Sequence, residues 1–510
     1  MKKQLKTEMC LKISIHLLLF LLIVLFFIKI YPQVLFDGDD WTYIGSFREH
    51  LLTPSTDEWN PIKVFPEYTM PLIGLLSVKL LFPLLNDYVF SLTVGMGLYS
   101  AFILYMLSLT IYFYSRKKFN ADLKKGLFVE ISFLVFSILI FHSFEGKSLS
   151  LFYASSPVCM FNYILPGMIN AAAVIFMISF EKFELEFEKW PFYLKILYSI
   201  WIYFCIFSNL FDSLILAVFC FLTILKKILI DNKPIIKKKK GKIIKDPFIY
   251  RFKGIGLYVC LLVIWTFSAY MEANGGRAAS IGGIKKVDIT NTLRKFIEIS
   301  NNIGIVFLII MAVVFIYMVI RIATDIIKMK KFEKIWELYG EYIFNIFLLI
   351  AVAIGTLVLC GTANAGYAGT VNATWGIWFF LILSILTGGL CILEKNDKLM
   401  KFSPAVLLTL IIMAIIPNAS LKMAEYVDNE IAIKCDNYIV SEIIAADQEG
   451  KVSFELHLPD MKSGDNWPLP IYMGQRMVNT LYHHGLIKNY MTVTSIPDSS
   501  INEKLGIKEN

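Results

Sequence analysis

The stretch Ile13–Tyr31, ISIHLLLFLLIVLFFIKIY, determines the fold class of this 510-residue chain. It has about the length of the ~20 apolar residues that cross a bilayer as a helix. Lysines precede it, but the run is longer than the core of a typical secretory signal, and no small-x-small cleavage site follows it. We therefore expect an uncleaved first membrane-spanning helix.

The composition of the whole chain agrees with a membrane protein. Hydrophobic residues make up 57% and charged residues only 18%. A single soluble core does not grow to this size, so the apolar surplus must face lipid. The net charge of +8 does not indicate nucleic-acid binding, because the basic residues gather in particular loops. The eight cysteines form no C-x-x-C pair, so we expect no zinc or redox site.

Further apolar segments predict an all-α polytopic protein with roughly eleven spans. After the first helix, we expect spans near residues 88–113, 127–142, 160–180, 193–207, 211–228, 255–271, 303–321, 342–360, 373–393 and 403–418. The pair at 193–228 could instead form one kinked helix. The short run 71–86 contains Lys79 and Pro83, which favours an interfacial or re-entrant segment over a span.

Basic residues determine the expected orientation, because they accumulate in cytoplasmic loops. The N-terminal lysines direct the first helix from inside to outside. The clusters Arg116-Lys117-Lys118 and Lys237–Lys240 then fall on the cytoplasmic side, provided that 71–86 does not cross. We expect a multi-pass cell-membrane protein with a cytoplasmic N-terminus and an extracytoplasmic C-terminus.

The last part of the chain differs from the spans. Apolar residues recur there at helical spacing and then alternate with polar ones, as in half-buried strands. The expected elements are an amphipathic helix over Leu421–Ala446, a strand over Val452–Leu458, a helix around Ile471–His484 and a strand near Tyr490–Ser495. We therefore divide the chain into a transmembrane domain, residues 1–420, and a small extracytoplasmic α/β domain, residues 421–510.

An acidic stretch, Asp37-Gly38-Asp39-Asp40-Trp41, follows the first span in the external loop 32–87. A low-dielectric surface and neighbouring like charges both raise the pKa of a carboxylate, which can then act as a general base on a hydroxyl group. Asp39 and Asp40 are the main catalytic candidates, with Asp37 as a supporting or competing third. A solvated acidic turn is the alternative.

Other side chains of the external face are candidates for substrate binding. The ring of Trp41 could stack on a sugar, or anchor the loop at the membrane interface. Glu67 is a weaker carboxylate candidate, with a structural role as its alternative. Tyr163 opens the span near 160–180, where it could line a donor cavity or simply lie at the interface.

The pattern resembles the GT-C superfamily of glycosyltransferases, which includes oligosaccharyltransferases, protein mannosyltransferases and aminoarabinose transferases. A short cytoplasmic tail, one span and an acidic motif in a long first external loop with a membrane-parallel helix are its features. The resemblance covers the overall topology and residues 37–41. It implies a catalytic base or metal-linked carboxylate at Asp39 or Asp40, and a polyprenyl-phosphate sugar as donor. A divalent cation is left open, since members differ in needing one.

The lysine-rich loop and the C-terminal domain are not general GT-C features, so a bacterial branch outside those subfamilies is expected. A lipid-phosphate donor needs a cation on the same face. Arg277, in Asn274-Gly275-Gly276-Arg277, could pair with phosphate in a bidentate manner, and glycines allow close approach. Asn274 and Arg277 are therefore substrate-binding candidates, with a flexible exit loop as the alternative.

Together these features favour a membrane glycosyltransferase of the hexosyltransferase type. It would move a sugar from a polyprenyl-phosphate donor to a cell-envelope glycan or lipid-linked acceptor on the outer face. The alternatives are a glycan polymerase or ligase, a transporter or flippase of envelope precursors, and a scaffold subunit. Few ionisable groups are expected near the membrane midplane, which argues against ion-coupled transport.

Overall fold

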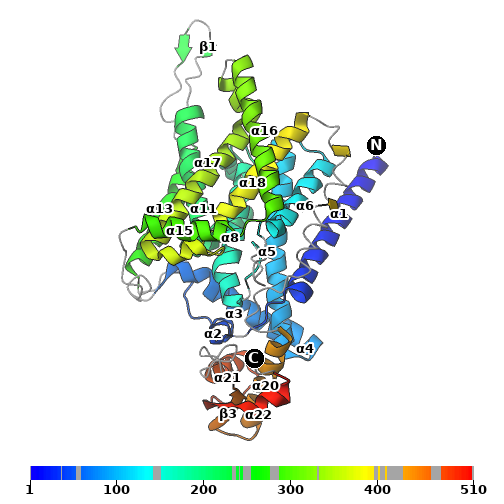
Figure 1. Ribbon diagram of the computed structural model, residues 1–510, viewed down its shortest axis with the longest axis vertical. Coiled ribbons are helices and arrows are strands. Elements are labelled where there is room, and N and C mark those ends of the chain that lie inside the picture. Colours follow the sequence, from blue (N-terminus) through cyan, green and yellow to red (C-terminus); the bar gives the residue numbers. More distant parts are fainter. Residues whose placement is uncertain are drawn as a thin grey trace.

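The computed structural model describes residues 2–35, 37–52, 59–141, 151–154, 156–231, 237–239, 242–244, 254–275, 287–329, 332–395, 400–401, 408–409, 429–460 and 473–507. A bundle of long helices carries a small α/β region at one end (Figure 1). Within the described ranges, nine helical segments are long and apolar enough to cross a membrane. The chain is therefore a multi-pass membrane protein, which confirms the expected fold class.

Some of the nine segments combine several helical elements. They are Cys10–Ile30 (α1, Lys2–Leu25, and η1, Phe26–Ile30), Pro61–Leu85 (η2, Pro61–Lys63; α3, Val64–Leu76; η3, Ser77–Leu81; α4, Phe82–Leu85), Tyr88–Lys118 (α5), Pro157–Ile178 (α7, Pro157–Cys159; η4, Met160–Ile164; α8, Leu165–Ile178), Leu210–Ile230 (α11, Leu210–Lys226; η5, Lys227–Asp231), Gly256–Asn274 (α13), Ile305–Met329 (α16), Lys334–Ala363 (α17, Phe332–Ala363) and Trp375–Glu394 (α18, Trp375–Lys395).

Shorter helices complete the bundle: α2 (Gly38–Gly45), α6 (Leu123–Leu139), α9 (Phe183–Lys189), α10 (Phe192–Ile206), α15 (Ile289–Ser300) and η6 (Ala365–Gly369). The expected spans near 127–142 and 193–207 correspond to α6 and α10, with 17 and 15 residues. α10 and α11 are separate helices, so a single kinked helix is wrong. Asn209 explains the break, because its side chain accepts the Phe211 backbone N–H at 2.9 Å and caps α11. The expected span 403–418 lies almost entirely outside the described residues.

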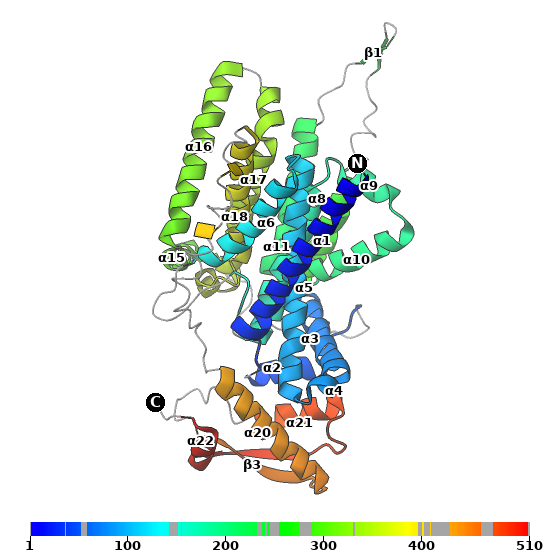
Figure 2. The same cartoon turned by 90° about the vertical axis from the view of Figure 1, so that its right-hand side faces the viewer.

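The segment 71–86 lies inside the helical stretch Pro61–Leu85, whose length and apolarity would allow a span. Its neighbours argue against crossing. His16 packs on Tyr112, whereas Phe27 approaches Gly97, so α1 and α5 are antiparallel. The connection between them therefore starts and ends at the same end of the bundle, and one helix within it cannot cross and return. Figure 2 shows α3 and α4 at that end.

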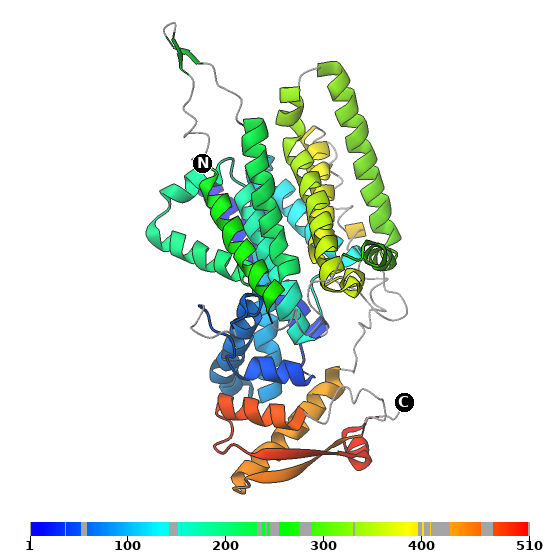
Figure 3. The same cartoon turned by 90° about the vertical axis from the view of Figure 1, so that its left-hand side faces the viewer.

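The two ends of the bundle differ in charge. The N-terminus and β1 (Lys237–Lys239), which pairs antiparallel with β2 (Lys242–Ile244), lie at one end, and the C-terminal elements lie at the other (Figure 3). The last turns of α5 and α16, with Lys117 and Lys328 among their basic residues, also reach the N-terminal end. Basic residues therefore gather at the end opposite the C-terminal region, as the expected alternation requires.

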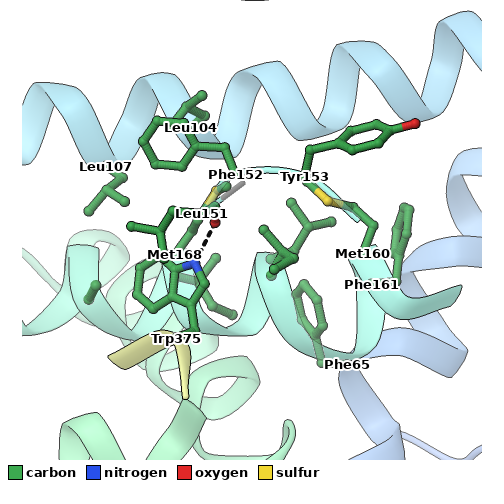
Figure 4. Packing of buried hydrophobic residues seen from close by; sticks show 14 of the residues in the cluster. Phe65, Leu104, Leu107, Leu151, Phe152, Tyr153, Met160, Phe161, Met168 and Trp375 are labelled. Carbon is green, nitrogen blue, oxygen red and sulfur yellow. Dashed lines mark hydrogen bonds between the residues drawn. The ribbon is translucent and has the colours of Figure 1, made fainter. Parts of the chain in front are cut away.

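The interior of the bundle is closely packed around the segment Leu151–Ala154. Leu104 of α5, Met168 of α8 and Trp375 of α18 surround this segment (Figure 4). The Trp375 indole N–H donates to the Leu151 carbonyl at 2.7 Å, which satisfies the polar group of a fully buried ring. These contacts fix the start of the helix Pro157–Ile178 relative to α5 and α18.

The C-terminal region is a small α/β unit. It contains α20 (Asn429–Gln448), β3 (Ser453–Pro459), α21 (Met473–His484), β4 (Thr492–Asp498) and α22 (Ser499–Leu505). β3 and β4 pair in parallel, from Ser453 opposite Thr492 to Pro459 opposite Asp498. The two strands and α21 are confirmed within a few residues of their expected positions. The predicted domain boundary at residue 421 lies outside the described residues.

Candidate functional site

The acidic stretch forms the start of α2. Asp37 is the N-cap residue, and its carboxylate accepts the backbone N–H of Asp40, while Asp40 Oδ2 accepts the backbone N–H of Asp37 at 3.2 Å. This reciprocal arrangement is a capping box, and negative side chains are favoured at the positive end of a helix. Asp37 and Asp40 therefore stabilise the first turn of α2.

Asp40 also reaches a second helix. Its side chain is fully buried, and Oδ1 accepts the Val158 backbone N–H at 2.8 Å and the Ser156 hydroxyl at 3.2 Å. These donors belong to the N-terminal turn of the helix Pro157–Ile178. Hydrogen bonds from two helix starts compensate the burial of this carboxylate. Asp40 thus joins the first external loop to the span that contains Tyr163.

Asp39 has a different environment, because its side chain is 61% exposed. Its Oδ1 accepts a hydrogen bond from Nη1 of Arg476, on α21, at 2.5 Å. The same Nη1 donates to the Thr42 hydroxyl at 3.1 Å, and that hydroxyl donates to the Gly38 carbonyl at 2.7 Å. Of the three acidic residues, Asp39 is therefore the one whose carboxylate is exposed to a solute.

α21 packs on α2 through buried contacts. The Thr480 hydroxyl donates to the Trp41 carbonyl at 2.6 Å, and His484 lies between the Ile44 carbonyl, 3.1 Å from Nε2, and the Tyr88 hydroxyl, 2.7 Å from Nδ1. A neutral imidazole with its hydrogen on Nε2 satisfies both neighbours. Burial, chiefly, lowers the pKa of His484 to about 4, which keeps the ring neutral.

Two glycines allow this close approach. A Cβ atom on Gly45 would meet the Thr480 hydroxyl and lie 3.0 Å from the Thr480 Cα atom. A Cβ atom on Gly74, in α3, would lie 2.7 Å from the Ile44 carbonyl oxygen. Glycine at position 45 therefore allows α21 to pack on α2, and glycine at position 74 allows α3 to pack on α2 beneath His484.

A further carboxyl group lies near Asp40. Asp436, on α20, is only 1% exposed, and neither of its carboxyl oxygens has a hydrogen-bond partner among the residues the structure describes. Burial and then the charge of Asp40 raise the pKa of Asp436 well above its ordinary value, and the nearby Trp41 indole lowers it only in part. The packed environment of Asp436 therefore favours the neutral form of its carboxyl group.

Two candidates of the first external loop are buried. The Trp41 ring is fully buried, with its centroid 6.3 Å from that of Tyr88, so it presents no face to a sugar and its stacking role is not supported. Glu67 is 4% exposed and pairs with Arg48 at 3.2 Å and Lys63 at 3.5 Å. Those ion pairs agree with the structural alternative for Glu67.

The remaining candidates lie on two spans. Tyr163 is half-buried in the helix that begins beside Asp40. Asn274 is exposed in the last turn of α13, and its amide donates to the Tyr270 carbonyl at 2.8 Å. Phe267 of α13 stacks on Trp59 of the first external loop, so this end of α13 lies at the same end of the bundle as α2. Arg277 lies outside the described residues.

The donor atoms at this site do not fit a resident divalent cation. Both oxygens of Asp40 accept hydrogen bonds, Asp37 caps α2, and Asp39 pairs with Arg476. Throughout the described part of the chain, no group of three or more His, Cys, Asp or Glu side chains has the arrangement of a metal site.

The residues that the C-terminal region contributes to this site were not predicted from the sequence. Arg476 lies 437 positions after Asp39. Asp436 and His484 lie 396 and 444 positions after Asp40. One local signal was present, since an Asp-x-x-Asp spacing before a helix is an N-terminal capping pattern. The adjacent pair His483-His484 gave no usable signal, because adjacent histidines are awkward ligands for one metal ion and their spacing does not indicate a hydrogen bond to a backbone carbonyl.

No protein-family model and no curated protein matches this sequence. Among solved structures, the chain is similar to the crystal structure of the Archaeoglobus fulgidus oligosaccharyltransferase in complex with zinc and sulfate, with 15% sequence identity and a TM-score of 0.39. The matched region covers 90% of this chain and 57% of that one. This similarity is too distant to indicate function. The fold itself is that of a multi-pass helical membrane protein with a small C-terminal α/β region.

Proposed function

We propose that this chain is a membrane glycosyltransferase that uses a polyprenyl-phosphate sugar as donor. The acceptor would be a hydroxyl group of a cell-envelope glycan or a lipid-linked glycan. The observation that carries the proposal is the exposed Asp39 carboxylate, which pairs with Arg476 at the end of the helical bundle opposite the N-terminus and β1. A carboxylate in this position can reach a donor whose lipid tail stays in the membrane.

The chemistry requires one base. Asp39 takes the proton of the acceptor hydroxyl while the hydroxyl oxygen attacks the anomeric carbon of the sugar. The new carbon–oxygen bond forms, the bond to the phosphate oxygen breaks, and polyprenyl phosphate leaves with the electron pair. Asp37 and Asp40 hold α2 in place and do not contact substrate. Asn274 and Arg277, after α13, are proposed to bind the donor phosphate, and Tyr163 to lie beside the donor.

The test compares cells that lack the natural gene and express the wild-type chain or Asp39→Asn at equal levels. General-base catalysis contributes about 10²–10⁴ in rate, so Asp39→Asn should almost abolish glycan transfer and cause the lipid-linked donor to accumulate. Mass spectrometry of lipid extracts and envelope glycans measures both. Glu442→Gln, which removes an exposed carboxylate of α20, is the matched control. Wild-type glycan and donor levels with Asp39→Asn would overturn the proposal.

A specific observation favours transport as a second candidate. Glu130 is fully buried between helices, with its Oε2 3.7 Å from His16 Nδ1, and Asp212, at the start of α11, has no hydrogen-bond partner for either carboxyl oxygen among the described residues. Buried ionisable groups within spans are typical of ion-coupled carriers. Unchanged glycan together with lost solute flux in the same Asp39→Asn cells would support transport.

A further inference from the structure

The pair Asp39–Arg476 connects the first external loop with the C-terminal region. Its two side chains are 61% and 35% exposed. An exposed ion pair contributes little to stability. The packing of α21 on α2 is therefore stabilised mainly by other contacts, among them the hydrogen bond from Thr480 to Trp41 and the contact of His484 with the Ile44 carbonyl.

The position of Arg476 is fixed independently of this ion pair. Its neighbour Gln475 accepts the Val493 backbone N–H at 2.9 Å and donates to the Met491 carbonyl at 3.1 Å, which attaches the N-terminal half of α21 to β4. The C-terminal half is attached to α2 through Thr480. α21 is bonded to β4 on one side and to α2 on the other, and it therefore holds the guanidinium group beside Asp39.

The arrangement constrains Asp39 in turn. The carboxylate projects from the first turn of α2, where an exposed side chain would otherwise sample several rotamers. Arg476 Nη1 contacts both Asp39 and Thr42, and Thr42 is itself bonded to the Gly38 carbonyl. The carboxylate therefore has one preferred orientation, and a positive charge lies beside the acidic turn.

We propose that Arg476 is a positioning residue of the same site, which fixes the orientation of the Asp39 carboxylate, so that the C-terminal region is part of the transferase centre. This inference rests on the proposed function. It assigns to the α/β unit a direct part in the reaction, because a base that is misplaced by about 1 Å can lose on the order of 10²-fold in rate.

The experiment measures the initial rate of sugar incorporation into envelope glycan in intact cells that express the full-length chain. Arg476→Gln should lower the rate about 10- to 100-fold, because the Asp39 carboxylate loses the contact that orients it.

Three further variants separate positioning from a purely structural role. Arg476→Lys keeps the charge without the planar fork, so it should restore part of the rate. Lys488→Gln, which removes an exposed cation of the same region, should match the wild type. Thr480→Val weakens the packing of α21 and should lower the melting temperature of the purified chain, whereas Arg476→Gln should leave that temperature unchanged.

The outcomes are distinct. If Asp39→Asn leaves transfer intact, the proposed function fails, and the role of Arg476 fails with it. If Asp39→Asn abolishes transfer while Arg476→Gln keeps the wild-type rate, the positioning role alone is wrong. An equal loss of rate and of melting temperature in Arg476→Gln and Thr480→Val, with no rescue by Arg476→Lys, would show that Arg476 serves only the packing of α21.

Discussion

Asp37, Asp39 and Asp40 occupy adjacent positions but have different surroundings. Asp40 is fully buried and bonded to two helix starts, Asp37 is half-buried in a capping box, and Asp39 is exposed and paired with Arg476. The helical turn produces this difference, because successive residues of a helix point in directions about 100° apart. One acidic motif therefore supplies both structural carboxylates and the candidate base.

At the same scale, His484 makes the packing of α21 depend on pH. Burial lowers its pKa from the ordinary 6.5 to about 4, so the packed state disfavours protonation. The stabilisation is complete above pH 6.5 and is lost as the pH falls toward 4, by up to about 3 kcal/mol. Hydrogen exchange of α21 should accelerate over this range. His484→Gln should remove the dependence, whereas the exposed neighbour His483→Gln should keep it.

Asp436 gives a dependence of the opposite sign. Its pKa is raised in the packed state, so the stabilisation is present at low pH and is lost as the pH rises through that raised value. Asp436→Asn should therefore make hydrogen exchange of α21 slower at alkaline pH than in the wild type. If His484→Gln and Asp436→Asn both exchanged at the wild-type rate across the whole pH range, the assignment of these two buried groups would be contradicted.

The sequence was sufficient to single out Asp39 and Asp40 as catalytic candidates, which they remain. It was not sufficient to separate them, since exposure depends on what α2 packs against. Trp41 illustrates the limit. An aromatic residue beside a carboxylate suggests sugar stacking, but the ring is buried beneath α20 and α21, whose approach depends on tertiary contacts far along the chain.

Among the elements, α21 and α2 form the closest contact between the two parts of the chain. Gly45→Ala should disrupt it, because the new methyl group would meet the side chain and the Cα atom of Thr480. Overpacking of this kind costs about 1–3 kcal/mol. Thermal unfolding of the purified chain in detergent should show a lower melting temperature.

Gly256→Ala is the matched control, since a methyl group at the start of α13 would have nothing within 4 Å. It should leave the melting temperature unchanged or raise it slightly. If Gly45→Ala kept wild-type stability and wild-type transfer, α21 would not lie on α2 in the membrane-embedded protein.

Helix and strand positions were largely predictable from periodicity, including the strand–helix–strand order of the C-terminal region. Hydropathy was less reliable where it had to decide what crosses the bilayer. α6 and α10 are shorter than a full span, and Pro61–Leu85 is long enough to be one. The antiparallel packing of α1 and α5 argues that Pro61–Leu85 does not cross the bilayer. No window of single-sequence hydropathy contains that information.

For the whole molecule, the distribution of charge determines where the site acts. The lysine-rich strand β1 and the basic ends of α5 and α16 lie at the end opposite α2 and the C-terminal unit. The positive-inside rule then predicts that Asp39 and Arg476 lie on the outer face. A polyprenyl-phosphate sugar consumed there has its phosphate at the same membrane surface as the proposed base.

The most direct test of this account is the sidedness of the two ends. In a chain with the exposed Cys10 and Cys260 replaced by Ser, one new cysteine is placed at Glu442, in α20, or at Lys117, in α5, and intact cells are treated with a membrane-impermeant maleimide. The account predicts labelling at position 442 and none at 117 until the cells are lysed. Labelling of both positions, or of 117 alone, in intact cells would contradict an outward-facing site built from Asp39 and Arg476.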